Sequence, residues 1–142
     1  MKLYLGLSVL AATAILAFSA GHGVKAKGEA PAATTFFSAD QAKRGEDEYI
    51  TNCVMCHGYN LNDGEFAPPI KGSFFQNMWV GKSLGDLFSK TVMTMPQSNP
   101  GSLDPGTYAD VLAYILQQNG IAAGDKDMAT DTDALNKIPL PW

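Results

Sequence analysis

The chain has 142 residues, of which 46% are hydrophobic and 17% charged. This length and composition fit one modest globular domain and exclude collagen-like, repetitive and disordered chains. Fourteen acidic residues outnumber ten basic ones, for a formal net charge of −4, which argues against nucleic-acid binding and permits a protein partner with a basic docking patch.

The N-terminus predicts export. Lys2 precedes an apolar run that ends at Phe18, which is the arrangement of the charged and hydrophobic regions of a secretory signal peptide. Small residues favour cleavage after Ala26, with Ser19 as the other candidate. The alternative is an uncleaved membrane anchor, because the apolar run is only slightly shorter than the about 20 residues that span a bilayer. We therefore expect residues 1–26 to be a signal peptide and the mature protein to be periplasmic.

A linker and then a helix are predicted after this leader. Residues 27–37 hold Ala, Gly, Pro and Thr without periodicity, which is typical of a mobile connection. Ser38 and Gln41 form a capping-box pattern, which predicts a helix over about 39–51. Gly45 inside this helix costs about 1 kcal/mol relative to Ala, so we expect another helix to approach closely there.

A Cys-x-x-Cys-His motif follows, formed by Cys53, Cys56 and His57. On a helical turn these positions share one face, so the thiols can form thioethers with haem vinyl groups while the imidazole reaches the iron. A thioredoxin-like pair would need a βαβ context, whereas the flanks here have a helical pattern. A zinc site would need four ligands, and the other histidine, His22, lies in the expected signal peptide. The motif predicts one covalent haem c with His57 as the proximal iron ligand.

The ligand on the other side of the iron separates electron transfer from chemistry at an open site. No histidine remains for this role, so the candidates are the methionines Met78, Met93 and Met95. Most methionines only fill gaps in a core. Met95 differs because Pro96 follows it and forces the chain out of the preceding helix into a loop. We expect Met95 to bind the iron, with Met93 as its rival.

The rest of the chain predicts a loop and two further helices. Residues 58–72 are rich in Gly, Asn, Asp and Pro, which indicates a loop with a carbonyl that can accept the second imidazole proton. A helix is predicted to start at Ser83, and its end delivers Met95. The last long helix is predicted from Asp104, a preferred N-cap before proline, to Gly120.

Beyond the last long helix, residues 121–142 are polar with a few apolar anchors. We expect a C-terminal extension that packs on the domain over 38–120 and includes one short helix at 131–136. No strand pattern occurs. The sequence thus predicts an all-α fold of three to five helices around one haem.

In its order of elements, the chain over 38–120 resembles a class I cytochrome c. Residues 68–72, Pro-Pro-Ile-Lys-Gly, are similar to the family's Pro-x-Leu-x-Gly segment, and this likeness implies that the Pro68 carbonyl accepts the His57 Nδ1 proton. Thr94-Met95-Pro96 is similar to the family's ligand loop, which favours Met95 over Met93. The resemblance also implies that the first and last helices cross, with contacts among Gly45, Tyr49, Val111 and Tyr114.

A narrower likeness concerns residues 79–81, 100–103 and 113–120, which resemble small cytochromes associated with bacterial quinoprotein dehydrogenases that oxidise alcohols or sugars. It implies an exported, monomeric electron carrier that is not an enzyme. Such a carrier accepts electrons from a periplasmic dehydrogenase and passes them to a terminal oxidase or another cytochrome. The alternatives are a membrane-anchored cytochrome subunit of a redox complex, and a haem sensor or enzyme with an open sixth site.

Overall fold

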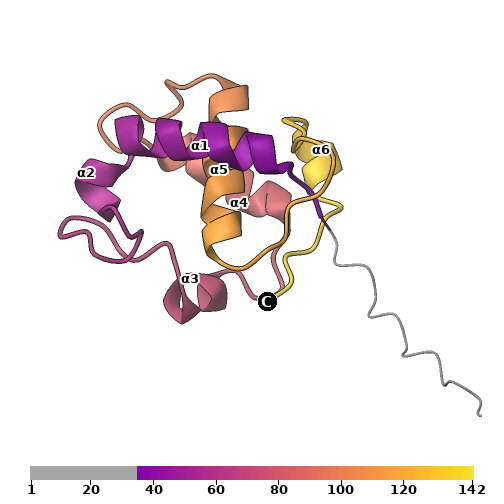
Figure 1. The fold of residues 1–142 in the computed structure, drawn as a ribbon, viewed down its shortest axis with the longest axis horizontal. Helices are drawn as coiled ribbons and strands as arrows, with labels where there is room; N and C mark the ends of the chain where they lie inside the picture. Colours follow the sequence, from indigo (N-terminus) through magenta and orange to yellow (C-terminus); the bar gives the residue numbers. More distant parts are fainter. Residues whose placement is uncertain (1–34) are drawn as a thin grey trace, which may run out of the picture. The chain divides into compact units, whose positions relative to one another are not determined.

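The computed structural model describes residues 35–142, so the expected signal peptide lies outside the described residues. The described part has six helices and no strand (Figure 1), which confirms the all-α fold. The helices are α1 (Ala39–Asn52), α2 (Val54–His57), α3 (Ser73–Met78), α4 (Leu84–Thr94), α5 (Pro105–Gln118) and α6 (Thr132–Leu135). None of them is long and apolar enough to cross a membrane.

The number of helices exceeds the expected three to five because of short elements. α2 and α6 are single turns of four residues each, and α3 was not predicted. Its N-cap is Gly72, which offers no side-chain hydrogen bond, so the sequence carries no capping signal there. The three longer helices begin where the sequence predicts.

The long helices start at capping side chains. Ser38 accepts a hydrogen bond from the Gln41 amide at 3.0 Å at the start of α1. Ser83 and Asp86 form a complete capping box at the start of α4, and Asp104 caps α5 ahead of a proline in its first turn. These bonds satisfy amides that a helix start leaves without partners, which is why such residues mark the boundaries.

α1 and α5 cross at Gly45. A Cβ atom added to Gly45 would overlap the backbone carbonyl of Asp110, so only glycine permits this approach. Next to the crossing, the rings of Tyr49 and Tyr114 lie 5.4 Å apart. The crossing that the resemblance implied is therefore present, and it carries much of the core.

The extension over 121–142 packs on the domain. Its backbone pairs with the start of α4. The Leu84 amide donates to the Ile138 carbonyl at 2.8 Å, and the Leu140 amide donates to the Lys82 carbonyl at 2.9 Å. α6 lies against α4 (Figure 1). The extension contributes four buried apolar side chains to the core, namely Ile121, Met128, Leu135 and Leu140.

Two residues at the end of the expected linker belong to the folded domain. Phe36 and Phe37 are both buried, and Phe37 is fully inaccessible. The Phe37 carbonyl accepts a hydrogen bond from the Gly124 amide at 2.7 Å. The hydrophobic core of the described residues therefore includes Phe36 and Phe37, two positions of the expected linker.

Candidate functional site

The Cys-x-x-Cys-His motif lies at the joint between α1 and α2. Cys53 ends α1, with its amide donating to the Tyr49 carbonyl at 2.8 Å, and it also begins α2, with its carbonyl accepting from the His57 amide at 3.0 Å. Cys53 and Cys56 are not joined by a disulfide, and both are half-buried. The structure thus brings two free thiols and an imidazole together within one turn.

His57 is held in one orientation by the loop that follows it. Its side chain is buried, and Nδ1 lies 3.2 Å from the Pro68 carbonyl. A carbonyl only accepts, so Nδ1 donates and the Nε2 lone pair stays free for a metal. Burial lowers the pKa of His57, and the hydrogen bond to Pro68 partly opposes this effect. The imidazole is therefore neutral at neutral pH, which is its metal-binding form.

The environment of Cys53 does not suit a redox-active thiol pair. Burial, with smaller contributions from Cys56 and Glu48, raises the pKa of Cys53 to about 11. Redox-active cysteines have lowered pKa values, because the thiolate is the reactive form. The Cys53 thiol therefore stays protonated at neutral pH, which disfavours a thioredoxin-like site. The absence of strands in the described residues disfavours such a site independently.

The loop that carries Pro68 is fixed to the end of α5 by Asn119. The Asn119 side chain accepts from the Gly72 amide at 2.9 Å and donates to the Ile70 carbonyl at 3.0 Å. Asn119 and the following Gly120 mark the end of the last long helix in the sequence, but nothing local predicts hydrogen-bond partners almost 50 residues away.

Met95 is the C-cap of α4, and its backbone is held from three sides. Its amide donates to Thr91 at 2.8 Å, and its carbonyl accepts from the Gly101 amide at 3.3 Å and from the Tyr108 hydroxyl at 2.6 Å. Tyr108 is buried in α5. Its hydroxyl is a supporting group that sequence reasoning misses, because Tyr108 lies 13 positions from Met95 and no local pattern pairs the two.

The other methionines differ from Met95 in exposure. Met93 lies in the last turn of α4 and is 68% exposed, whereas Met95 is half-buried. Met55, between the two cysteines, points into solvent, and Met128 is buried in the core. Met78 is exposed at the end of α3.

Several exposed apolar residues follow the predicted site residues in the sequence. Phe74, Met78 and Val80 follow the loop that carries Pro68, and each is more than half exposed. Phe75 is instead buried, with its ring 5.7 Å from that of Trp142. Two free thiols and a neutral imidazole within one turn, with a methionine thioether at the end of α4, are a donor set that fits haem c.

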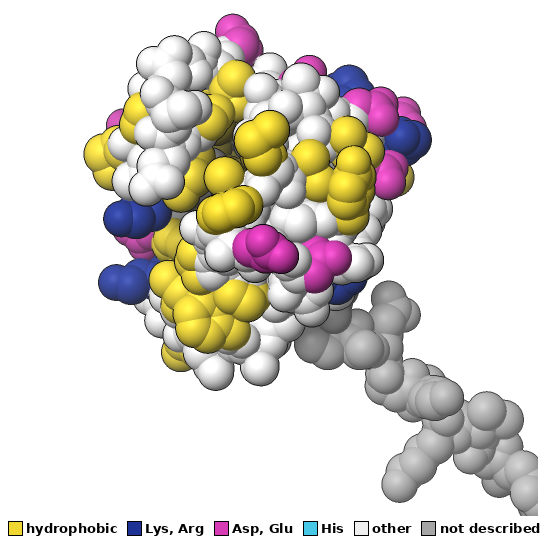
Figure 2. All heavy atoms as spheres, turned by 90° about the vertical axis from the view of Figure 1, so that its left-hand side faces the viewer, with side chains coloured by type: hydrophobic (Ala, Val, Ile, Leu, Met, Phe, Trp, Pro, Cys, Tyr) yellow, Lys and Arg dark blue, Asp and Glu magenta, His cyan; other side chains and the backbone are white. Residues whose placement is uncertain are grey.

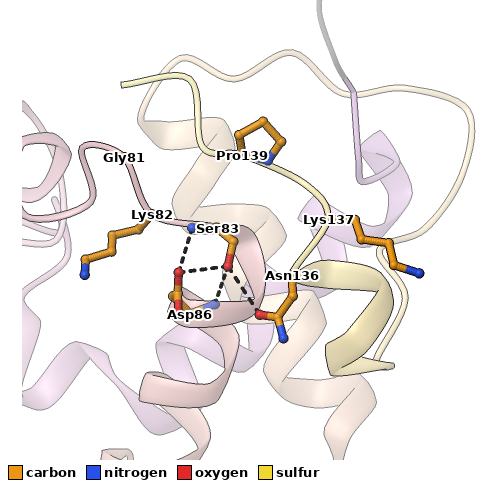
Figure 3. A pocket seen from close by; sticks show the side chains of 7 residues that line it. All are labelled: Gly81, Lys82, Ser83, Asp86, Asn136, Lys137 and Pro139. Atoms are coloured by element: carbon orange, nitrogen blue, oxygen red, sulfur yellow. Dashed lines mark hydrogen bonds between the residues drawn. The ribbon is translucent and has the colours of Figure 1, made fainter.

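One hollow in the described surface lies away from the predicted site residues. It has a volume of about 570 Å³ where the extension meets the start of α4 (Figure 3). Inside it, the Ser83 hydroxyl forms hydrogen bonds with the Asp86 carboxylate and, at 3.3 Å, with the Asn136 side-chain oxygen. Its lining residues are Gly81, Lys82, Ser83, Asp86, Asn136, Lys137 and Pro139, none of which is a predicted site residue.

Comparisons with known proteins agree with this geometry. A family model described as "Cytochrome C oxidase, cbb3-type, subunit III" matches residues 40–115, which is more than half of the chain and spans α1 to most of α5. Comparisons with curated proteins and with solved structures found no match. The chain therefore belongs to this family of class I monohaem cytochromes c, whose covalently attached haem c and its iron serve electron transfer.

Proposed function

We propose that the protein is a single-electron carrier whose iron is bound by His57 and Met95 and whose haem is attached to Cys53 and Cys56. The observation that carries this proposal is the fixed imidazole, with Nδ1 on the Pro68 carbonyl and Nε2 free. When bound, haem c would supply an iron that takes up and releases one electron, and His57 and Met95 would hold it.

The residues of the chain hold this site rather than react in it. The Pro68 carbonyl sets the tautomer and the ring orientation of His57. Tyr108 and Gly101 hold the backbone of Met95 at the end of α4. Methionine as the second ligand raises the reduction potential, which suits transfer between protein partners.

Absorption spectroscopy of the purified holoprotein tests this function. We expect haem that remains with the chain in denaturing electrophoresis, a weak far-red band of methionine-ligated iron in the oxidised form, and no CO binding by the reduced form. Rapid CO binding at neutral pH would contradict electron transfer and favour a sensor or an enzyme with an open site.

Tyr108→Phe should loosen the loop that carries Met95. Loss of one buried hydrogen bond costs about 1 kcal/mol, so the fraction of molecules with Met95 off the iron should rise about fivefold. Slow CO binding to the reduced protein and the intensity of the far-red band measure that fraction. Tyr114→Phe is the control, because the Tyr114 hydroxyl forms no hydrogen bond with another described residue. Equal CO binding by both variants would contradict the role of Tyr108.

We further propose an exported, monomeric carrier that accepts electrons from a periplasmic dehydrogenase, such as a quinoprotein, and passes them to a terminal oxidase or another cytochrome. The likeness of residues 79–81, 100–103 and 113–120 to cytochromes of quinoprotein dehydrogenases supports this donor. Reduction by a quinoprotein dehydrogenase during turnover would support it, and the absence of reduction would contradict it.

A second candidate is a cytochrome subunit fixed in an oxidase complex, which the description of the matching family favours. The mature N-terminus separates the two candidates. A carrier cleaved after Ala26 leaves the membrane fraction in low salt, whereas a fixed subunit keeps its leader or co-purifies with membrane subunits. Mass spectrometry of the protein from both fractions makes the comparison.

A further inference from the structure

The part of the chain that carries the attachment motif has a one-sided charge. Between Arg44 and Lys71 there are five acidic residues and no lysine or arginine. The five are Glu46, Asp47, Glu48, Asp63 and Glu65. Lys43 pairs with the first two at 3.1 and 3.4 Å, whereas the last three form no ion pair with any described residue. Three carboxylates without a cationic partner therefore remain in this segment, of which Glu48 and Asp63 accept hydrogen bonds from Asn52 and Asn60.

The same segment exposes large apolar side chains. Single exposed apolar residues are common on proteins, but a group of them in one region marks an interaction site. The exposed fractions are 46% for Ile50, 85% for Met55, 73% for Tyr59 and 77% for Phe66. These four come from the end of α1, from α2 and from the loop that follows.

Backbone contacts gather these residues at one end of the fold. The loop after α2 folds back, so that a Cβ atom added to Gly64 would overlap the Cys56 carbonyl. The Tyr49 hydroxyl donates to the Gly58 carbonyl at 2.7 Å and ties the loop to α1. Figure 2 looks onto the side where α2 lies and shows apolar side chains spread over it, with acidic side chains among them.

We propose that this acidic apolar face docks the redox partner, and that the partner presents an apolar centre within a rim of lysine and arginine side chains. The face consists of Met55, Tyr59 and Phe66 with the carboxylates of Glu48, Asp63 and Glu65. The inference rests on the proposed electron-carrier function, since it identifies where the partner of that carrier binds.

Charge complementarity selects this occupant over a second copy of the chain. Two copies joined through this face would bring like carboxylates together, which is unfavourable, whereas a basic rim is attracted to them. The face also includes a residue of the attachment motif, because the exposed Met55 stands between Cys53 and Cys56 in the sequence. A partner bound there would be close to the two cysteines to which the haem would be attached.

Redox-inert paramagnetic complexes test the face in the reduced holoprotein by ¹H–¹⁵N NMR. The probes are tris(phenanthroline)chromium(III), which is cationic and aromatic, and hexacyanochromate(III), which is anionic. We expect the cation to broaden the amide signals of Met55, Tyr59 and Phe66 selectively, and the anion to leave them sharp. Added salt should weaken the effect of the cation.

Two sets of variants separate charge from apolar contact. Glu48→Lys with Glu65→Lys should weaken binding of the cation by about tenfold. Asp125→Lys with Asp133→Lys, which changes the net charge equally in the extension, should leave it unchanged. Phe66→Ser should weaken binding of the phenanthroline complex but not that of hexaamminechromium(III), which has the same charge without aromatic ligands.

Three outcomes would overturn the docking face. One is cation-induced broadening centred on another part of the molecule, and another is broadening of Met55 by the anion. The third is a wild-type dimer that Phe66→Ser dissociates, which would identify a second copy as the occupant. A protein that binds the cation at this face but carries an iron open to CO would instead contradict the proposed function and leave the face in place.

Discussion

Met95→Ala is expected to abolish the far-red band of the oxidised protein and to make the reduced iron bind CO stoichiometrically. Met95 is half-buried at the end of α4. Alanine at this position has no sulfur and therefore offers the iron no ligand. The reduction potential should fall as well, because a methionine ligand raises it. Optical titration with CO and a spectroelectrochemical titration measure the two effects.

Met93→Ala is the matched control, because Met93 lies two residues earlier and is 68% exposed. We expect it to keep the far-red band and to exclude CO. If Met93→Ala loses the band while Met95→Ala retains it, the ligand assignment is reversed. If neither variant loses the far-red band, Met78 becomes the candidate ligand.

Gly45→Ala should destabilise the fold by about 3 kcal/mol, which corresponds to a fall of roughly 10–20 °C in Tm. The added Cβ overlaps the backbone carbonyl of Asp110 rather than a movable side chain. α1 must therefore move away from α5, and Tyr49 and Tyr114 next to the crossing lose contact. Urea denaturation of the oxidised holoprotein measures the change in the free energy of unfolding.

Gly106→Ala is the control for Gly45→Ala, since it makes the same substitution in a helix that has room for it. The nearest atom to a Cβ at Gly106 is the Asp104 carboxylate oxygen at 3.1 Å, which a small side-chain rotation can relieve. Alanine favours a helix by up to about 1 kcal/mol over glycine. A stability of Gly45→Ala equal to that of Gly106→Ala would show that the crossing tolerates a side chain.

Local signals predicted the parts of the fold that depend on neighbouring residues. Ser38, Ser83 and Asp104 each bond to an amide within three residues, so the starts of α1, α4 and α5 were predictable. The contact between Gly45 and α5 was expected from the cost of an interior glycine. These features survive in the structure because tertiary packing agrees with the local preference.

The parts that sequence reasoning missed depend on distant partners. The Tyr108 hydroxyl reaches Met95 across 13 positions, and Asn119 reaches Ile70 across 49. The composition around Phe37 predicts a linker. Its burial in the core and its hydrogen bond from the Gly124 amide appear only in the folded structure. No periodicity or capping rule encodes such pairs, because both describe residues within a turn or two of each other.

α5 supports both sides of the site from a single helix. Tyr108 near its start holds the Met95 carbonyl, and Asn119 at its end holds the segment that follows Pro68. The rate of electron transfer depends on the reorganisation energy, which is the cost of moving the surroundings of the iron between its oxidised and reduced geometries. Because one helix helps to hold the backbone near both proposed ligands, we expect those surroundings to change little when the charge changes and the reorganisation energy to be low.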